Sequence, residues 1–211
     1  MSADRATYHH GNLRSALIDA AWEMARSSAP EKVTLREVAR RVGVSHNAAY
    51  RHFADRQELM RSLADRAVEE LTARMQARNA TVSDDREPAE IARARFKETA
   101  RAYVAFATDE PHLFQMAFHL EFSGPDVVPV ISERRDGPYG ILNDVLDEMV
   151  AVGEIPAERR LGAEVVCWAA VHGFAELCTK GPLGRLPAPE REATLDLLFH
   201  TLQQGLKAPV G

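Results

Sequence analysis

The 211-residue sequence is poor in cysteine, with only Cys167 and Cys178, and this scarcity excludes a disulfide framework. No apolar run approaches the roughly 20 residues that a membrane-spanning helix needs. The first residues, MSADRATYHHGNLRS, lack the apolar segment of a signal peptide. We therefore predict a cytoplasmic protein with no membrane segment, in which both thiols are reduced and buried.

Catalytic motifs are missing as well. The sequence has no glycine-rich phosphate loop, no nucleophile elbow and no His-Glu-x-x-His pattern. Two pairs have helical spacing, His172 with Glu176 and His112 with His119, but neither belongs to a closed set of metal ligands. We predict no enzymatic activity, no cofactor and no metal.

An excess of positive charge is also missing, because the formal net charge is −5. The charge is unevenly distributed. Residues 1–80 hold 13 Lys and Arg against 10 Asp and Glu, whereas residues 81–211 hold 13 against 21. A mildly basic head on an acidic body is typical of a protein that presents one end to a polyanion.

Apolar residues recur at helical spacing along almost the whole chain, and no segment alternates as a strand does. The pattern predicts an all-α protein of about nine helices. The polar stretch NATVSDDREP at 79–88 is the best candidate for a domain boundary. The expected helices are 12–26, 35–42, 46–52, 55–75, 89–108, 111–122, 139–152, 157–179 and 190–206.

The segment TLREVARRVGVSHNAAYRHF has the spacing of a helix-turn-helix. Thr34 and Glu37 form a capping box that begins the first short helix. Gly43 permits the left-handed turn that ends it. Ser45 can then cap the second helix, in which Ala49 is left to pack inward.

The outer face of that second helix is made of residues with hydrogen-bonding tips. His46, Asn47, Tyr50, Arg51 and His52 leave little apolar surface there. Such residues can be no more than the solvated face of a short helix. Within a helix-turn-helix, however, they fit the major groove of DNA, and an Asn side chain can pair with adenine through two hydrogen bonds.

The same residues resemble the tetracycline-repressor (TetR) family of bacterial regulators. The resemblance rests on Thr34, Val38, Ala39, Val44-Ser45 and Tyr50-Arg51-His52-Phe53 followed by Leu59, and it extends over residues 10–78. The segment WAAVHG at 168–173 resembles a Trp–His–Gly signature in the C-terminal domain of one branch of the family.

The resemblance implies that Tyr50 and His52 bind DNA phosphates. It implies the same for the basic residue after the recognition helix, which is Lys in most relatives and Arg56 here. Together with the helix-turn-helix pattern, it predicts a DNA-binding set of Thr34, Arg36, Ser45, His46, Asn47, Ala48, Tyr50, Arg51, His52 and Arg56.

Three domains are expected: a helix-turn-helix domain at 1–55, a connecting helix at 56–78, and a ligand-binding and dimerisation domain at 79–211. The last is rich in aromatic residues with histidines between them, as an apolar pocket with a few polar groups requires. These residues can also be plain core. The candidate pocket residues are Phe96, Tyr103, Phe106, His112, Phe114, Phe118, Phe122, Trp168 and His172.

The helix VVCWAAVHGFAEL is apolar on nearly every side, and the last helix carries a leucine stripe of its own. Both patterns fit an intermolecular four-helix bundle, which the resemblance also implies. The alternative is an intramolecular core only. The candidate dimer contacts are Val165, Ala169, Glu176, Leu195, Leu198, Phe199 and Leu202.

Two functions remain open at this point. The first is a homodimeric repressor that binds a palindromic operator on double-stranded DNA and is released by a partly apolar small-molecule effector. The second is a constitutive DNA-binding dimer whose C-terminal domain binds a protein partner or no ligand. A ligand pocket in the C-terminal domain favours the first, and a solidly filled domain favours the second.

Overall fold

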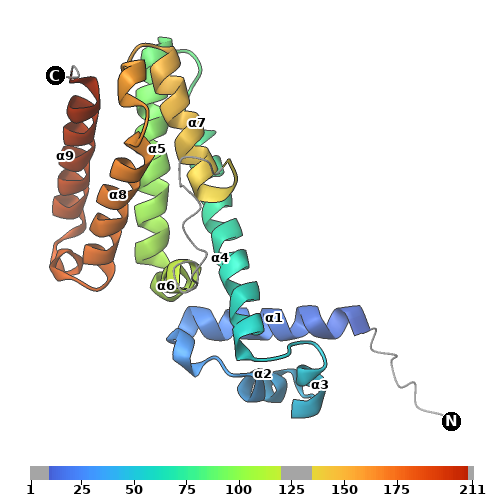
Figure 1. The fold of residues 1–211 in the computed structure, drawn as a ribbon. Helices are drawn as coiled ribbons and strands as arrows, with labels where there is room; N and C mark the ends of the chain where they lie inside the picture. The colour runs from blue at the N-terminus through green and yellow to red at the C-terminus, as the bar shows by residue number, and fades with distance from the viewer. Residues whose placement is uncertain (1–9, 120–134, 209–211) are drawn as a thin grey trace. The chain divides into compact units, whose positions relative to one another are not determined.

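A computed structural model describes residues 10–119 and 135–208, and this part of the chain contains nine α-helices and no strand (Figure 1). The predicted all-α fold is thus confirmed. The α-helices are α1 His10–Ser27, α2 Leu35–Val42, α3 His46–Tyr50, α4 Arg56–Asn79, α5 Pro88–Asp109, α6 Pro111–His119, α7 Gly137–Ala151, α8 Ala163–Thr179 and α9 Ala188–Lys207. Short 3-10 helices are η1 Pro30–Lys32, η3 Ala157–Arg159 and η4 Pro182–Arg185.

The chain forms two compact units. Within the described residues, the first comprises 10–67 with 112–119, and the second comprises 68–111 with 135–208. The division falls inside α4, which is one continuous helix in Figure 1 and contributes residues to both units. α6 belongs to the first unit from its second residue, His112, although it follows α5 in the chain.

Both helices of the helix-turn-helix begin where the sequence predicts, and α2 also ends where it predicts. The Thr34 hydroxyl accepts a hydrogen bond from the Glu37 N–H at 3.3 Å and so caps α2. Gly43 has a φ of 77° and ends the helix, a backbone conformation that a Cβ would strain. Ser45 accepts from the Ala48 N–H at 3.2 Å and caps α3.

Two details of this region differ from the prediction. The Glu37 carboxylate does not complete a capping box with Thr34, because it accepts hydrogen bonds from the Arg40 guanidinium instead. α3 ends at Tyr50 rather than His52, since the N–H groups of Arg51 and His52 reach back only three residues in a tight last turn.

A shared core orients α3. Ala49 and Phe53 are fully buried together with Val38, Leu59 and Leu63. Burying the side chain of a Phe, Leu or Val stabilises the fold by about 1.5–3 kcal/mol each. The opposite face of α3 is therefore free.

The second unit is a bundle in which α5 packs against α7 and α8, and α8 packs against α9 (Figure 1). Its largest fully buried side chains include Phe96 and Phe106 of α5. Both cysteines are buried as predicted, and burial raises the pKa of the Cys167 thiol to about 12. That thiol is therefore protonated and unreactive at neutral pH.

α8 begins later than expected. The predicted helix at 157–179 is interrupted, since Gly162 has a φ of 82° between η3 and α8. Glu164 in the first turn of α8 is 1% exposed. Its carboxylate accepts a hydrogen bond from Arg160 at 2.7 Å, and Arg160 also donates to the side-chain oxygen of buried Asn143 at 2.8 Å. The buried charge is therefore compensated.

Candidate DNA interface and ligand cluster

The free face of α3 carries the residues that the sequence singled out. His46, Asn47, Tyr50 and Arg51 are exposed, Ala48 and His52 are half-buried, and Ala49 is buried. The rings of His46 and Tyr50 meet edge to face with centroids 4.6 Å apart. This contact limits how both rings can turn, so the polar tips are held on one side of a rigid helix.

A hollow of about 560 Å³ adjoins this face where α2 begins. Thr34, Arg36, Arg40 and His46 contribute to its lining, together with Glu37, whose carboxylate is paired with Arg40. Both α2 and α3 begin here with side-chain caps, and a helix N-terminus attracts anions through its unpaired N–H groups and its dipole. The surroundings therefore suit phosphate oxygens.

Two arginines near the free face of α3, Arg40 and Arg56, differ in how they are held. Arg40 donates from Nε to the Glu37 carboxylate at 2.9 Å, and this hydrogen bond from Arg40 holds the pKa of Glu37 below its usual value. Arg56 donates to the backbone carbonyls of Val33 at 2.8 Å and Pro30 at 2.6 Å. Arg56 thus joins the start of α4 to the loop before α2, in addition to any role toward phosphate.

In the second unit, three predicted pocket residues come together. The Tyr103 hydroxyl lies 2.8 Å from His172 Nδ1, and the rings of Trp168 and His172 stack with centroids 5.1 Å apart. Tyr139, which sequence reasoning missed, lies with its ring centroid 5.8 Å from that of Trp168. The one sign of Tyr139 in the sequence is its position directly after Gly137-Pro138, where the next helix begins. We call these four residues the aromatic cluster.

The other predicted pocket residues lie elsewhere. Phe96 meets Phe199 of α9 edge to face at 6.4 Å, and Phe106 lies under the Arg74 guanidinium at 5.2 Å, so both fill the core of the second unit. His112, Phe114 and Phe118 are on α6 in the first unit, where the two phenylalanines pack together with centroids 5.0 Å apart. Phe122 is outside the described residues.

The predicted dimer residues divide into two groups. Leu195 and Phe199 are each 2% exposed in the single chain, so their side chains belong to the core of the protomer, contrary to the prediction. Val165 and Ala169 are exposed, Leu198 and Leu202 are half-buried, and Glu176 is half-buried with an ion pair to Lys180. The apolar stripe of α9 is thus too wide to lie wholly in an interface. Its buried part, which includes Phe199, packs toward Phe96 of α5.

An apolar face remains exposed on α8 and α9. It is formed by Val165, Val166, Ala169, Gly173 and Leu177 of α8 together with Leu197, Thr201 and Gly205 of α9. Leu197 is 63% exposed and Val166 55%. Among the described residues, a Cβ added at Gly173 would meet no atom within 4 Å apart from the backbone of its own helix. We call this surface the α8–α9 face.

Among the residues that the structure describes, no three His, Cys, Asp or Glu side chains are grouped so that they could hold a metal ion. In the same residues, no helix combines the length and apolarity needed to cross a membrane.

Two family models match the chain. One, described as "Bacterial regulatory proteins, tetR family", matches residues 17–63. The other, described as "Tetracyclin repressor-like, C-terminal domain", matches residues 96–202, which is half of the 211 residues. The chain belongs to the TetR family. It is therefore a DNA-binding transcription regulator, with a helix-turn-helix domain followed by a helical C-terminal domain.

Solved structures share the fold of this TetR-family regulator. A protein with unknown function from Rhodococcus sp. RHA1 is 28% identical, with a TM-score of 0.75 over 97% of this chain and 100% of that one. A putative tetR family transcription regulator from Shewanella sp. PV-4 is 20% identical, with a TM-score of 0.59 over 89% and 96%.

A TetR variant from Acinetobacter baumannii AYE, solved in complex with minocycline, is 17% identical. Its TM-score is 0.61 over 99% of this chain and 100% of that one. No curated protein matched the chain.

The position of His172 in the aromatic cluster of this TetR-family regulator predicts that stability depends on pH. Burial lowers the pKa of His172 below its ordinary 6.5, with the carboxylate of Glu176 opposing the shift and Lys180 adding to it. The unfolded chain therefore binds a proton at His172 more readily than the folded chain does. We expect the free energy of unfolding to fall as the pH drops below about 6.5.

Urea denaturation between pH 5 and 8 measures this effect. In a His172→Gln variant the part of the slope due to His172 is lost, so its curve is flatter than that of the wild type. His200→Gln, at an exposed position of α9, is the matched control and keeps the wild-type slope. Equal slopes for His172→Gln and the wild type would contradict the assignment.

Proposed function

We propose that this protein is a homodimeric repressor that binds a palindromic operator and is released by a small-molecule effector. The observation that carries the proposal is the exposed face of α3, where His46, Asn47, Tyr50 and Arg51 project from a helix whose other face is fixed in a core. Side-chain donors and acceptors on such a face can read base edges in the major groove.

The roles proposed within the interface differ. His46 and Asn47, in the first turn of α3, are assigned to base edges, as befits the N-terminal residues of a recognition helix. Thr34, Arg36, Tyr50, Arg51, His52 and Arg56 are assigned to the phosphate backbone, with Ser45 and Ala48 placing the helix close to it. Phosphate contacts fix the register of a protein on DNA, and base contacts supply its sequence preference.

Dimerisation is proposed to occur through the α8–α9 face. Exposed side chains as large as Leu197, Val166 and Leu177 on neighbouring helices form an apolar surface of the kind that marks an interface. Gly173 adds to the argument, because a glycine inside a helix costs about 1 kcal/mol relative to alanine. No neighbour in the described part of the chain requires a residue without a Cβ there. Close approach by a helix of a second copy accounts for it.

The aromatic cluster is proposed as part of the effector site. Tyr103 and His172 supply a hydrogen-bonded polar pair, and Trp168 and Tyr139 supply aromatic surface. Small-molecule sites combine apolar walls with a few placed polar groups in this way. The solved minocycline complex of a structurally similar protein is consistent with this role. A dimer that ignores small molecules is the alternative function.

Base reading by Asn47 is tested by comparing specific and random DNA. Footprinting on DNA upstream of its own gene first defines the operator. We expect Asn47→Ala to weaken operator binding by about 1–3 kcal/mol and random binding little, since only base contacts distinguish sequences. Tyr50→Phe, which removes a proposed phosphate contact, is the matched control and weakens both. If Asn47→Ala weakened both equally, Asn47 would not read bases.

The dimer interface is tested by placing a charge on it. Leu197→Glu leaves the new carboxylate in water in the monomer but would bury it unpaired in the dimer, so we expect folded monomers by light scattering. Ala105→Glu, at an exposed position of α5, is the control and stays dimeric. Gly173→Ala is a second test. Alanine stabilises α8 itself, but its Cβ would hinder the close approach of a helix from the second copy, so we expect weaker dimerisation. A dimer unchanged by both α8–α9 variants would refute this interface.

Release by an effector requires reciprocal coupling. An effector lowers operator affinity only by binding better to a state that holds DNA poorly, with a coupling of about 1–3 kcal/mol. Compounds that raise the melting temperature supply the candidates. We expect a true effector to bind more weakly, by the same factor, when a saturating operator duplex is present. Equal affinities with and without operator for every binding compound would favour the constitutive alternative.

A further inference from the structure

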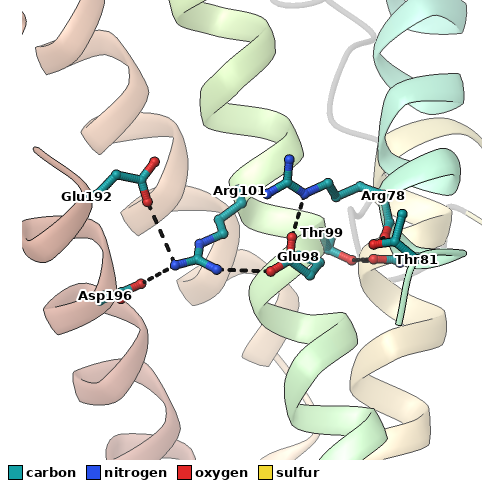
Figure 2. Close-up of polar contacts among 8 residues, drawn as sticks. Arg78, Thr81, Glu98, Thr99, Arg101, Glu192 and Asp196 are labelled. Carbon is teal, nitrogen blue, oxygen red and sulfur yellow. Dashed lines mark hydrogen bonds and ion pairs between the residues drawn. The ribbon is translucent and has the colours of Figure 1, made fainter. Parts of the chain in front are cut away.

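The C-terminal end of α4 is held by a carboxylate that two arginines share. Figure 2 shows Glu98 of α5 between the guanidinium groups of Arg78, in the last turn of α4, and Arg101, one turn further along α5. Arg78 Nε donates to one oxygen of Glu98 at 2.5 Å, and Arg101 Nη1 donates to the other at 3.0 Å. Both oxygens are therefore used.

A second tie lies beside the first. The side chain of Asn79, the last residue of α4, donates to the hydroxyl of Thr99 at 2.9 Å and accepts from it at 3.1 Å. Thr99 is 3% exposed. Two adjacent residues of α4 are thus bonded to two adjacent residues of α5, which leaves the end of α4 little freedom to slide or turn.

The same network continues to α9. Arg101 Nη2 donates to Asp196 at 3.0 Å, and Lys97 pairs with the same carboxylate at 2.9 Å (Figure 2 shows the Arg101 contacts). Glu192 lies 3.7 Å from Arg101 and is mostly exposed. Asp196 directly precedes Leu197 of the α8–α9 face. The chain of contacts therefore leads from the end of α4 to the edge of the proposed dimer interface.

Isolated ion pairs on the surface contribute little to the stability of a fold. The side chains of this network are held more firmly, because they are partly buried and share partners. The side chain of Glu98 is 18% exposed, and although burial opposes its charged form, the hydrogen bonds from Arg78 and Arg101 hold its pKa below the usual value. Arg101 Nε is buried with no acceptor in the part of the chain that the structure describes. The Arg101 guanidinium thus lies between the carboxylates of Glu98 and Asp196, while its Nε–H donor is left without an acceptor among the described residues.

We propose that Glu98 is a positioning residue that couples α4 to α9 and thereby sets the distance between the two recognition helices of the dimer. The inference rests on the proposed function. α4 runs without interruption from Arg56, next to the helix-turn-helix, to the anchored residues Arg78 and Asn79. A change in how its end is held against α9 therefore changes where each helix-turn-helix lies in the dimer.

The test measures binding to a series of operator duplexes in which the spacer between half-sites is lengthened and shortened one base pair at a time. We expect the wild type to prefer one spacing sharply. Glu98→Gln keeps the shape but loses the charge that holds both arginines. We expect it to lower the preference for the best spacing about five- to tenfold, within the range of ordinary coupling, while affinity for a single half-site stays unchanged.

Three further variants separate positioning from stability. Glu192→Gln, which removes only a distant and exposed partner of Arg101, is the matched control and keeps the wild-type spacing profile. Arg78→Gln combined with Glu98→Gln is expected to be no worse than Glu98→Gln alone, because Glu98→Gln already breaks the contact between these two side chains. Asp196→Asn cuts the network at α9, on a side chain 43% exposed, and flattens the profile even if Glu98→Gln folds poorly.

The outcomes are distinct. A lowered melting temperature with an unchanged spacing profile in Glu98→Gln and Asp196→Asn would overturn the positioning role and leave the repressor proposal intact. Loss of half-site affinity in the same variants would also overturn the positioning role, since the helix-turn-helix itself would then be affected. A wild type that shows no preference among spacings would overturn the proposed dimeric function and this inference together.

Discussion

The burial of Ala49 and Phe53 in the first unit determines which face of α3 is available to DNA. Both side chains are fully buried, and Phe53 also lies under the Arg14 guanidinium at 4.9 Å. A helix of five residues has too few internal hydrogen bonds to be stable alone, so its orientation comes from this packing. The positions of His46, Asn47 and Tyr50 depend on it.

Polar groups within the second unit have a different role from those on α3. Tyr103 with His172 and Glu98 with Arg78 join separate helices, and Arg160 joins Glu164 of α8 to Asn143 of α7. Such contacts demand defined geometry, because a partly satisfied buried polar group is costly. Apolar packing between helices tolerates sliding more readily. The polar contacts therefore fix how the helices of this bundle are placed relative to one another.

The predictions that the structure confirmed are those governed by neighbours in the chain. The caps at Thr34 and Ser45 act across three residues, as their spacing indicates. The predicted site was less complete. Its aromatic residues belong to both units, and Tyr139 joins the cluster through a ring contact with Trp168 that no local pattern announces.

The sequence by itself determined the all-helical class, the order of the helices and the helix-turn-helix, because periodicity and capping depend on residues three or four apart. Only the tertiary structure decided which leucines of α9 are core and which are surface, since Leu195 and Leu197 differ only in the helices that surround them. It also decided the partners of Glu98 and Arg101. Arg78 lies 20 residues before Glu98 and Asp196 lies 95 after Arg101, and such contacts form only when separate helices pack together.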